Sequence, residues 1–213
     1  MPEDGPEKQL LNFADPMCSW CWGFSPVVEA LRERFDQEAP MSLVLGGLRP
    51  GAQEPLDDKA KAMIRGHWEH VAEMTGQPFD HAFFEREGFR YNTEPACRAA
   101  VTVRALLPEL AFPYLAELHH AFYAENRDIT DREVLAELAV GLGIDKDRFE
   151  RCFEGDEARA QAQRDFLLSR HLGVSGFPTL IAKRGKEYGV VTVGYRPRKH
   201  LEPALSAWLA KAA

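Results

Sequence analysis

Two cysteines, Cys18 and Cys21, stand three positions apart in the segment DPMCSWCWGF. This spacing suits half of a zinc site, a structural disulfide, or two thiols that exchange electrons. A zinc site needs four ligands, usually from two close pairs, and the sequence has no second CxxC and no HxxxH segment. His67 and His70 are spaced for one helical face, but no pattern links them to Cys18. The residue types favour a redox-active pair and predict no bound metal.

The other two cysteines, Cys97 and Cys152, have no close cysteine neighbour in the sequence. A chain of 213 residues does not need disulfides to hold its core, so a structural role for the four cysteines is disfavoured. Both Cys97 and Cys152 stand among apolar residues, and we expect them to be small core residues. A second disulfide or a relay thiol is the alternative that the sequence leaves open.

The elements around the pair predict where it lies. An apolar run at 10–14 predicts a buried strand, apolar residues at helical spacing predict a helix over 19–35, and SLVLGGL predicts a second strand over 42–48. Strand, helix and strand within about 40 residues form a βαβ unit with parallel strands and a right-handed crossover. The cysteines therefore lie where the first strand ends and the helix begins, at the sheet edge that commonly binds ligands.

This placement assigns a different role to each thiol. Cys18 at the helix start lies near unpaired backbone N–H groups and the positive end of the helix dipole, which favour a thiolate. The thiolate is the form that attacks a disulfide. Cys21 lies one turn further on the same face and can attack the resulting mixed disulfide. We predict that Cys18 is the nucleophile and that Cys21 is the resolving thiol.

Helical patterns fill the middle of the chain, including a capping box with Thr130 as N-cap and Glu133 three residues later. Strand patterns return at 179–184 and 189–194, which predict an antiparallel hairpin, and an amphipathic helix closes the sequence. The order βαβ, helices, ββα predicts an α/β fold with a large helical insertion. One domain would contain residues 1–54 and 174–213, and residues 55–173 would form the inserted helical domain.

Three segments resemble a known family: DPMCSWCWGF after the first strand, GVSGFPTLI before the hairpin and, more weakly, YNTEPA in the insertion. Together with the element order, they resemble the DsbA-like oxidoreductases, which have a thioredoxin fold. The similarity is greatest to the cytoplasmic FrnE-like branch, related to hydroxychromene-carboxylate isomerases and kappa-class glutathione transferases. The resemblance covers nearly the whole chain in element order and implies thiol–disulfide exchange with protein or small disulfides.

The resemblance also implies a cis peptide bond before Pro178, which would expose the backbone of Phe177 to an extended substrate. Trp20 and Trp22 would either pack against the inserted helices or form an apolar floor for substrate. Ser19 and Trp20 stand where strongly oxidising relatives carry Pro-His. We therefore expect a potential between about −120 mV, as in DsbA, and about −270 mV, as in thioredoxin, nearer the latter.

The main alternative is a glutathione-dependent isomerase or transferase of the sister branches. There the family typically has a serine at the position of Cys18, so a pair of cysteines disfavours this alternative. Asp15 is expected to be a turn residue before Pro16, with a role as proton carrier for Cys21 as the second option. His119 and His120 are adjacent, so they should point to different faces and form no common site.

The composition limits the classes of partner that the protein can bind. The formal net charge of −7 disfavours nucleic acid and anionic membrane surfaces. The first nine residues lack the basic start and apolar stretch of a secretory signal, so we expect a cytoplasmic protein. We expect no bound cofactor, with glutathione or another dithiol protein supplying or removing electrons from disulfide-containing substrates. The sequence leaves the oligomeric state open.

Overall fold

The computed structural model describes residues 7–211, so most of the stretch used for the secretion argument lies outside it. Two short 3₁₀ helices, His81–Glu85 and Pro108–Leu110, accompany the regular elements. The strands and α-helices are β1 (Lys8–Ala14), α1 (Ser19–Phe35), β2 (Met41–Leu45), α2 (Asp58–Thr75), α3 (Glu94–Leu106), α4 (Ala111–Tyr123), α5 (Arg132–Gly141), α6 (Lys146–Glu154), α7 (Asp156–His171), β3 (Thr179–Arg184), β4 (Glu187–Val193) and α8 (Arg198–Ala210).

The four strands form one mixed sheet in the order β2-β1-β3-β4. β1 and β2 are parallel, and β3 runs antiparallel to both β1 and β4, which confirms the predicted βαβ unit and the terminal hairpin. β2 ends at Leu45, earlier than the predicted limit at residue 48, because the chain turns at Gly47, which has a φ of +66°. The predicted α/β thioredoxin fold with a helical insertion is confirmed.

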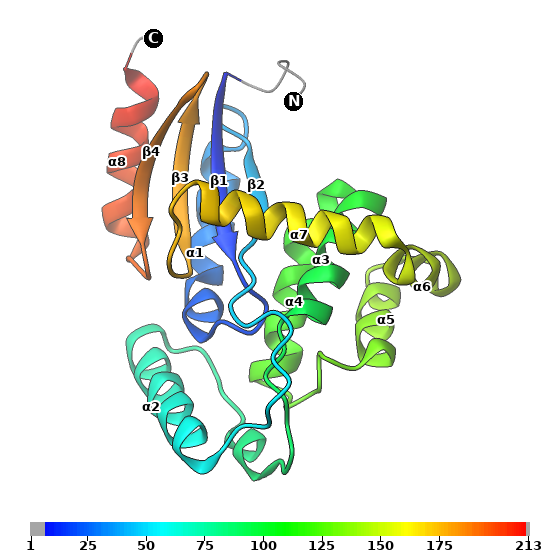
Figure 1. Cartoon of the computed structure of the whole chain (residues 1–213). Coiled ribbons are helices and arrows are strands. Elements are labelled where there is room, and N and C mark those ends of the chain that lie inside the picture. The colour runs from blue at the N-terminus through cyan, green and yellow to red at the C-terminus, as the bar shows by residue number, and fades with distance from the viewer. Residues whose placement is uncertain (1–6, 212–213) are drawn as a thin grey trace.

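Helices cover both faces of this sheet, as Figure 1 shows for α7 on one side and α1 and α8 on the other. Alternate residues of β1 face opposite layers. Leu10 packs with α1 and α8, whereas Leu11 and Phe13 pack with Leu168 of α7. Burial on both faces explains why Leu10, Leu11, Phe13 and Ala14 are apolar instead of alternating with polar residues, and the buried Asn12 is the exception in this run.

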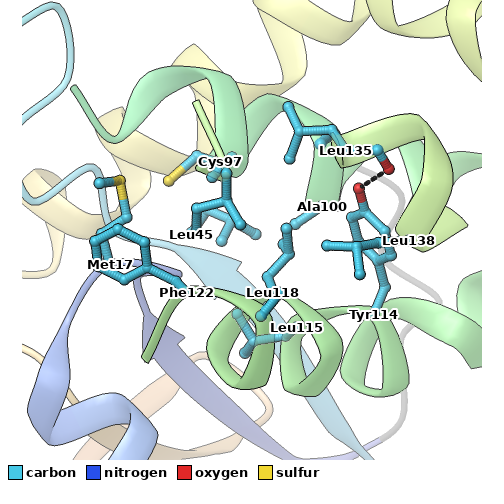
Figure 2. Close-up of a cluster of buried hydrophobic side chains, with 14 of the residues drawn as sticks. Met17, Leu45, Cys97, Ala100, Tyr114, Leu115, Leu118, Phe122, Leu135 and Leu138 are labelled. Atoms are coloured by element: carbon cyan, nitrogen blue, oxygen red, sulfur yellow. Dashed lines mark hydrogen bonds between the residues drawn. The ribbon is translucent and has the colours of Figure 1, made fainter. Parts of the chain in front are cut away.

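The largest buried cluster joins the helical insertion to the end of the sheet that carries the cysteine pair. Figure 2 shows Met17 and Leu45 beside Cys97 and the side chains of α4 and α5. Within this cluster the Tyr114 hydroxyl donates a 2.8 Å hydrogen bond to the carbonyl of Leu135. Met17 is fully buried and directly precedes Cys18, so the insertion fixes the loop that carries the cysteine pair.

An ion pair from the insertion covers part of the outer edge of β2. Asp165 of α7 accepts the N–H of Leu45 at 2.8 Å, and Arg104 of α3 donates to the Leu43 carbonyl at 2.6 Å. Arg104 also bonds both carboxylate oxygens of Asp165, at 2.8 and 3.0 Å. This bidentate pair occupies backbone groups that a neighbouring strand would otherwise take.

The prediction that Thr130 is the N-cap of α5 is wrong. α5 starts at Arg132, and Asp131 is its N-cap, accepting the N–H of Glu133 at 2.8 Å. The Thr130 hydroxyl instead donates to Asp128, because the chain is still in a turn at that residue.

The domain boundaries at residues 54 and 174 stay a prediction. Among residues 7–211, no helix has the length and apolar character needed to cross a bilayer.

Candidate redox site

Cys18 is the N-cap of α1, at the place that the sequence predicts. The Cys21 backbone N–H donates to the Cys18 sulfur at 3.4 Å, and the helix begins at Ser19. An N–H group aimed at the sulfur stabilises the thiolate more than the thiol. Cys18 is buried, with 6% of the residue exposed.

Cys21 lies one helical turn deeper and is only 3% exposed. Burial raises the pKa of its thiol well above the ordinary value, and the hydrogen bond and charge of Cys18 raise it further. Both cysteines are free thiols in the structure. The less buried thiol is thus at the helix start, and the thiol with the raised pKa lies one turn behind it, which is the order that an attacking and a resolving thiol require.

Asp15 anchors the loop before the pair. Its carboxylate accepts the backbone N–H groups of Met17 at 2.9 Å and Leu48 at 2.7 Å, and the Cys97 thiol lies 3.4 Å from it. The bond to Met17 is the turn contact that the sequence predicts for Asp15. Complete burial raises the carboxyl pKa, and the hydrogen bonds to Leu48 and Met17 partly offset that effect. The contacts to Leu48 and Cys97 are not apparent from the sequence.

Phe177 and Pro178 complete the other side of the site. The peptide bond between them is cis, and the Phe177 carbonyl lies 3.4 Å from the Cys18 sulfur. The Phe177 ring packs tightly against Gly46, where an added Cβ would lie 2.0 Å from the ring carbon Cζ. Gly46 itself is held in place, because its N–H donates to the Ala14 carbonyl at 2.8 Å.

Replacing Gly46 with alanine is therefore expected to displace Phe177 and to slow disulfide exchange. Overpacking of this kind lowers the free energy of unfolding by about 1–3 kcal/mol. Gly66→Ala is the control, since Gly66 is a helical glycine whose Cβ would meet nothing within 4 Å, and it should stabilise the protein slightly. Urea unfolding and an insulin reduction assay measure both effects. Parent-like stability and rate in Gly46→Ala would contradict the contact.

The two tryptophans of the motif have different surroundings. Trp20 is half-buried and packs against His70 of α2 and Tyr195, with ring centroids 5.3 and 6.1 Å apart. Trp22 is buried, stacks on Tyr123 of α4 and donates its indole N–H to the Pro78 carbonyl at 3.1 Å. Trp22 thus packs against the insertion, the first of the two predicted alternatives, whereas contact of Trp20 with a substrate stays a prediction.

The segment YNTEPA of the insertion contacts both loops of the site. The Tyr91 hydroxyl donates to the Met17 carbonyl, immediately before Cys18. Thr93 accepts the N–H of Arg49 at 3.1 Å, and Asn92 accepts the N–H of Gly51 at 2.7 Å. The weakest of the three resembling segments therefore fixes the position of the cysteine loop and of the loop after β2.

The predicted burial of Cys97 is confirmed, and that of Cys152 is wrong. Cys97 is completely buried in α3, and burial followed by the Asp15 charge raises its pKa. Cys152 is exposed on α6, because Phe149 and Phe153 fill the buried face of that short helix. Within the described residues, no three histidine, cysteine or acidic side chains come together as a group that could hold a metal ion.

Alkylation of the native protein should separate these two thiols. Cys152 is expected to react with iodoacetamide at the rate of a free thiol, whereas Cys97 should react only after unfolding in urea, because its thiol is both buried and protonated. Peptide mass spectrometry of samples quenched at successive times measures each rate. Rapid native labelling of Cys97 would contradict the packing of α3.

Sequence reasoning left one histidine without a function. His119 of α4 is buried, and its Nε2 lies 3.2 Å from the Asp15 carbonyl oxygen. His120 is exposed, and its Nδ1 lies 3.4 Å from a carboxylate oxygen of Glu125, so the two histidines do point to different surroundings, as predicted. A pair of adjacent histidines in a helical pattern carries no signal of which one reaches the site.

Two solved structures and one curated relative are similar to this chain. A candidate protein disulfide isomerase from Nitrosomonas europaea is 40% identical, with a TM-score of 0.91 over 96% of this chain and 98% of the other. The cytosolic disulfide reductase DsbM from Pseudomonas aeruginosa with GSH is 30% identical, with a TM-score of 0.73 over 95% and 96% of the two chains. The ClpXP adapter protein SpxH of Bacillus subtilis is 22% identical over 173 residues, 81% of this chain.

The coverage of these matches differs. The chain spans 57% of the length of the Bacillus subtilis adapter, whereas it covers nearly the whole of both solved structures. The model of the DSBA-like thioredoxin domain matches residues 9–206, which include the cysteine pair, the helical insertion and the hairpin. The chain therefore belongs to the family of DSBA-like thioredoxin domains.

Proposed function

We propose that this protein is a dithiol–disulfide oxidoreductase that acts through Cys18 and Cys21. The observation that carries the proposal is the position of the Cys18 sulfur at the start of α1. There it accepts the Cys21 N–H at 3.4 Å, while the Cys21 thiol stays buried behind it. This arrangement supports a nucleophile and a resolving thiol separated by one helical turn.

The reaction has two steps. The Cys18 thiolate attacks one sulfur of a substrate disulfide, forming a mixed disulfide and releasing the other substrate sulfur as a thiolate. Cys21 then loses its proton and attacks the Cys18 sulfur, which closes the Cys18–Cys21 disulfide and releases the second substrate thiolate. Both released thiolates take up protons, so the substrate gains two electrons that the dithiol loses; the reverse sequence oxidises a substrate dithiol.

Protein or peptide disulfides and glutathione are the proposed substrates. Phe177, whose carbonyl lies 3.4 Å from the Cys18 sulfur, and the half-buried Trp20 would contact them, and Pro178, which has no N–H, would border the reacting sulfurs. The resemblance to DsbM with GSH supports glutathione as co-substrate, and its description as cytosolic supports a reducing compartment. No bound metal or cofactor is needed, since a dithiol protein or glutathione would exchange electrons with the pair.

Turnover assays test this proposal against the sister-branch alternative. The protein should accelerate the reduction of insulin by dithiothreitol or by continuously regenerated glutathione, and the reduction of oxidised glutathione by dithiothreitol. It should not isomerise 2-hydroxychromene-2-carboxylate. Cys152→Ser is the control, since this exposed thiol lies on α6, outside the site. Isomerisation with no disulfide reduction would overturn the proposal in favour of the isomerase.

The match to adapter proteins supports a second candidate, a protein that binds a partner chain without exchange chemistry. Binding of this kind would not depend on the nucleophile. An adapter role predicts equal affinity of the parent and of Cys18→Ser for a captured partner, whereas an oxidoreductase should retain its partner only through a bond to Cys18.

A further inference from the structure

A cavity of about 370 Å³ lies between α1 and α4, and the buried thiol Cys21 forms part of its wall. Asn12 and Pro178 line the same cavity. The exposed side chains of Glu29 and Glu117 also line it, so the cavity leads from the thiol toward solvent. Most of the remaining wall is apolar, so its few polar side chains indicate which chemistry the cavity can support.

His119 lines this cavity, and its tautomer follows from its contacts. The ring Nε2 lies 3.2 Å from the backbone carbonyl oxygen of Asp15. A carbonyl oxygen can only accept, so Nε2 carries the proton and Nδ1 presents a free lone pair. The side chain is 1% exposed, and Nδ1 has no hydrogen-bond partner among residues 7–211. Burial lowers the pKa of His119 to about 4, so the ring is neutral at pH 7.

The second exchange step creates a need for such an acceptor. Cys21 must lose its proton while Cys18 is bonded to the substrate, and the substrate then covers the accessible side of the pair. Burial raises the pKa of Cys21, so few of its thiols ionise unaided at pH 7. The Asp15 carboxylate is occupied by the N–H groups of Met17 and Leu48. The cavity offers the proton another route.

We propose that His119 Nδ1, acting through water held in this cavity, accepts the proton of Cys21 when the resolving thiol attacks. Asn12 is a second buried side chain of the cavity wall, and its Oδ1 has no partner among the described residues, so it is an acceptor that can hold this water. This inference rests on the proposed exchange reaction.

The step is balanced in protons and electrons. The Cys21 S–H bond breaks, its electron pair forms the new bond to the Cys18 sulfur, and the bond from Cys18 to the substrate breaks. The departing substrate thiolate or bulk water takes the proton that His119 briefly holds. The thiolate charge that develops on Cys21 favours a protonated ring, which offsets part of the cost of charging a buried imidazole.

The charged and titratable groups around His119 come from three parts of the chain. The rings of Trp22 and Tyr123 contact its ring, with centroids 6.1 and 6.3 Å away. Burial raises the pKa of Tyr123 well above its ordinary value, so this hydroxyl stays protonated near pH 7. The others are Asp15 after β1, the α1 residues Cys21, Glu29 and Arg32, and Glu117 and His120 on α4.

A two-phase reaction with the aromatic disulfide DTNB tests the inference in a Cys152→Ser background. One equivalent of DTNB releases a first coloured thiolate when Cys18 attacks and a second when Cys21 closes the pair. His119→Gln keeps an N–H for the Asp15 carbonyl but has no basic nitrogen. It should leave the first phase within twofold of the parent and slow the second at least about tenfold. His120→Gln, the exposed neighbour, should change neither phase.

Chemical rescue separates a proton-transfer role from a structural one. Free imidazole should accelerate the second phase of His119→Ala, whose truncated side chain enlarges the cavity, and not that of His119→Gln. Nitrogen NMR of the native protein should find His119 in the Nε2–H tautomer. The inference is overturned by a parent-like second phase in His119→Gln, by an Nδ1–H tautomer, or by imidazole having no effect on His119→Ala. An absent first phase in the parent would instead overturn the proposed function.

Discussion

Replacing Cys18 with serine is expected to abolish disulfide exchange, lowering kcat/KM for insulin reduction by about a thousandfold or more. A hydroxyl at the start of α1 can still accept the Cys21 N–H, so the helix keeps its cap and the fold should be retained. The chemistry fails because a serine hydroxyl is neither ionised at neutral pH nor able to form a disulfide. Circular dichroism should therefore match the parent while the rate disappears.

Cys21→Ser should behave differently, because the nucleophile remains while the resolving thiol is lost. Incubation with oxidised glutathione should leave one glutathione bonded to Cys18, visible in the intact mass and removable with dithiothreitol. Cys152→Ser is again the matched control and should turn over at the parent rate. Equal activity of Cys18→Ser and the parent would show that another thiol carries the reaction.

Replacing Asp165 with alanine is expected to lower the free energy of unfolding by about 3 kcal/mol. The change leaves the Leu45 N–H without its acceptor and the guanidinium of Arg104 without its carboxylate. Both losses fall in a largely buried region, where an unpaired polar group is costly. β2 ends directly before Gly46, so weaker anchoring of this strand should also reduce exchange.

Glu157 on the same helix provides the comparison. It pairs with Arg164 on the surface, and its side chain is 74% exposed, so Glu157→Ala should unfold at nearly the same urea concentration as the parent. Urea unfolding followed by tryptophan fluorescence measures both variants. An Asp165→Ala protein as stable as Glu157→Ala would show that the ion pair does not hold the edge of the sheet.

Local patterns were enough to predict the sheet, the insertion and the position of the cysteine pair. β1, α1 and β2 are adjacent in sequence, and their apolar periodicities differ clearly, so the start of α1 and the place of Cys18 follow directly. The prediction of Thr130 as N-cap was wrong for a local reason. Thr130 and Asp131 are both residue types that cap helices well, and only the backbone geometry decides between them.

The contacts that sequence reasoning missed join distant parts of the chain. Gly46 meets the ring of Phe177, Asp15 meets Cys97, and the same loop meets His119 of α4. Each depends on how the insertion packs against the sheet, which no short window of residues encodes. Cys152 shows the same limit, because the sequence does not reveal which side of a short helix faces the core.

The most direct test of this account is the disulfide that forms when the purified protein is equilibrated in glutathione buffers of increasing oxidising strength. Alkylation, digestion and mass spectrometry should find a single disulfide linking Cys18 to Cys21, with Cys97 and Cys152 alkylated after unfolding. Its midpoint should lie between about −120 and −270 mV, nearer the reducing value. Failure of Cys18 and Cys21 to join at any ratio of glutathione to its disulfide would contradict the account.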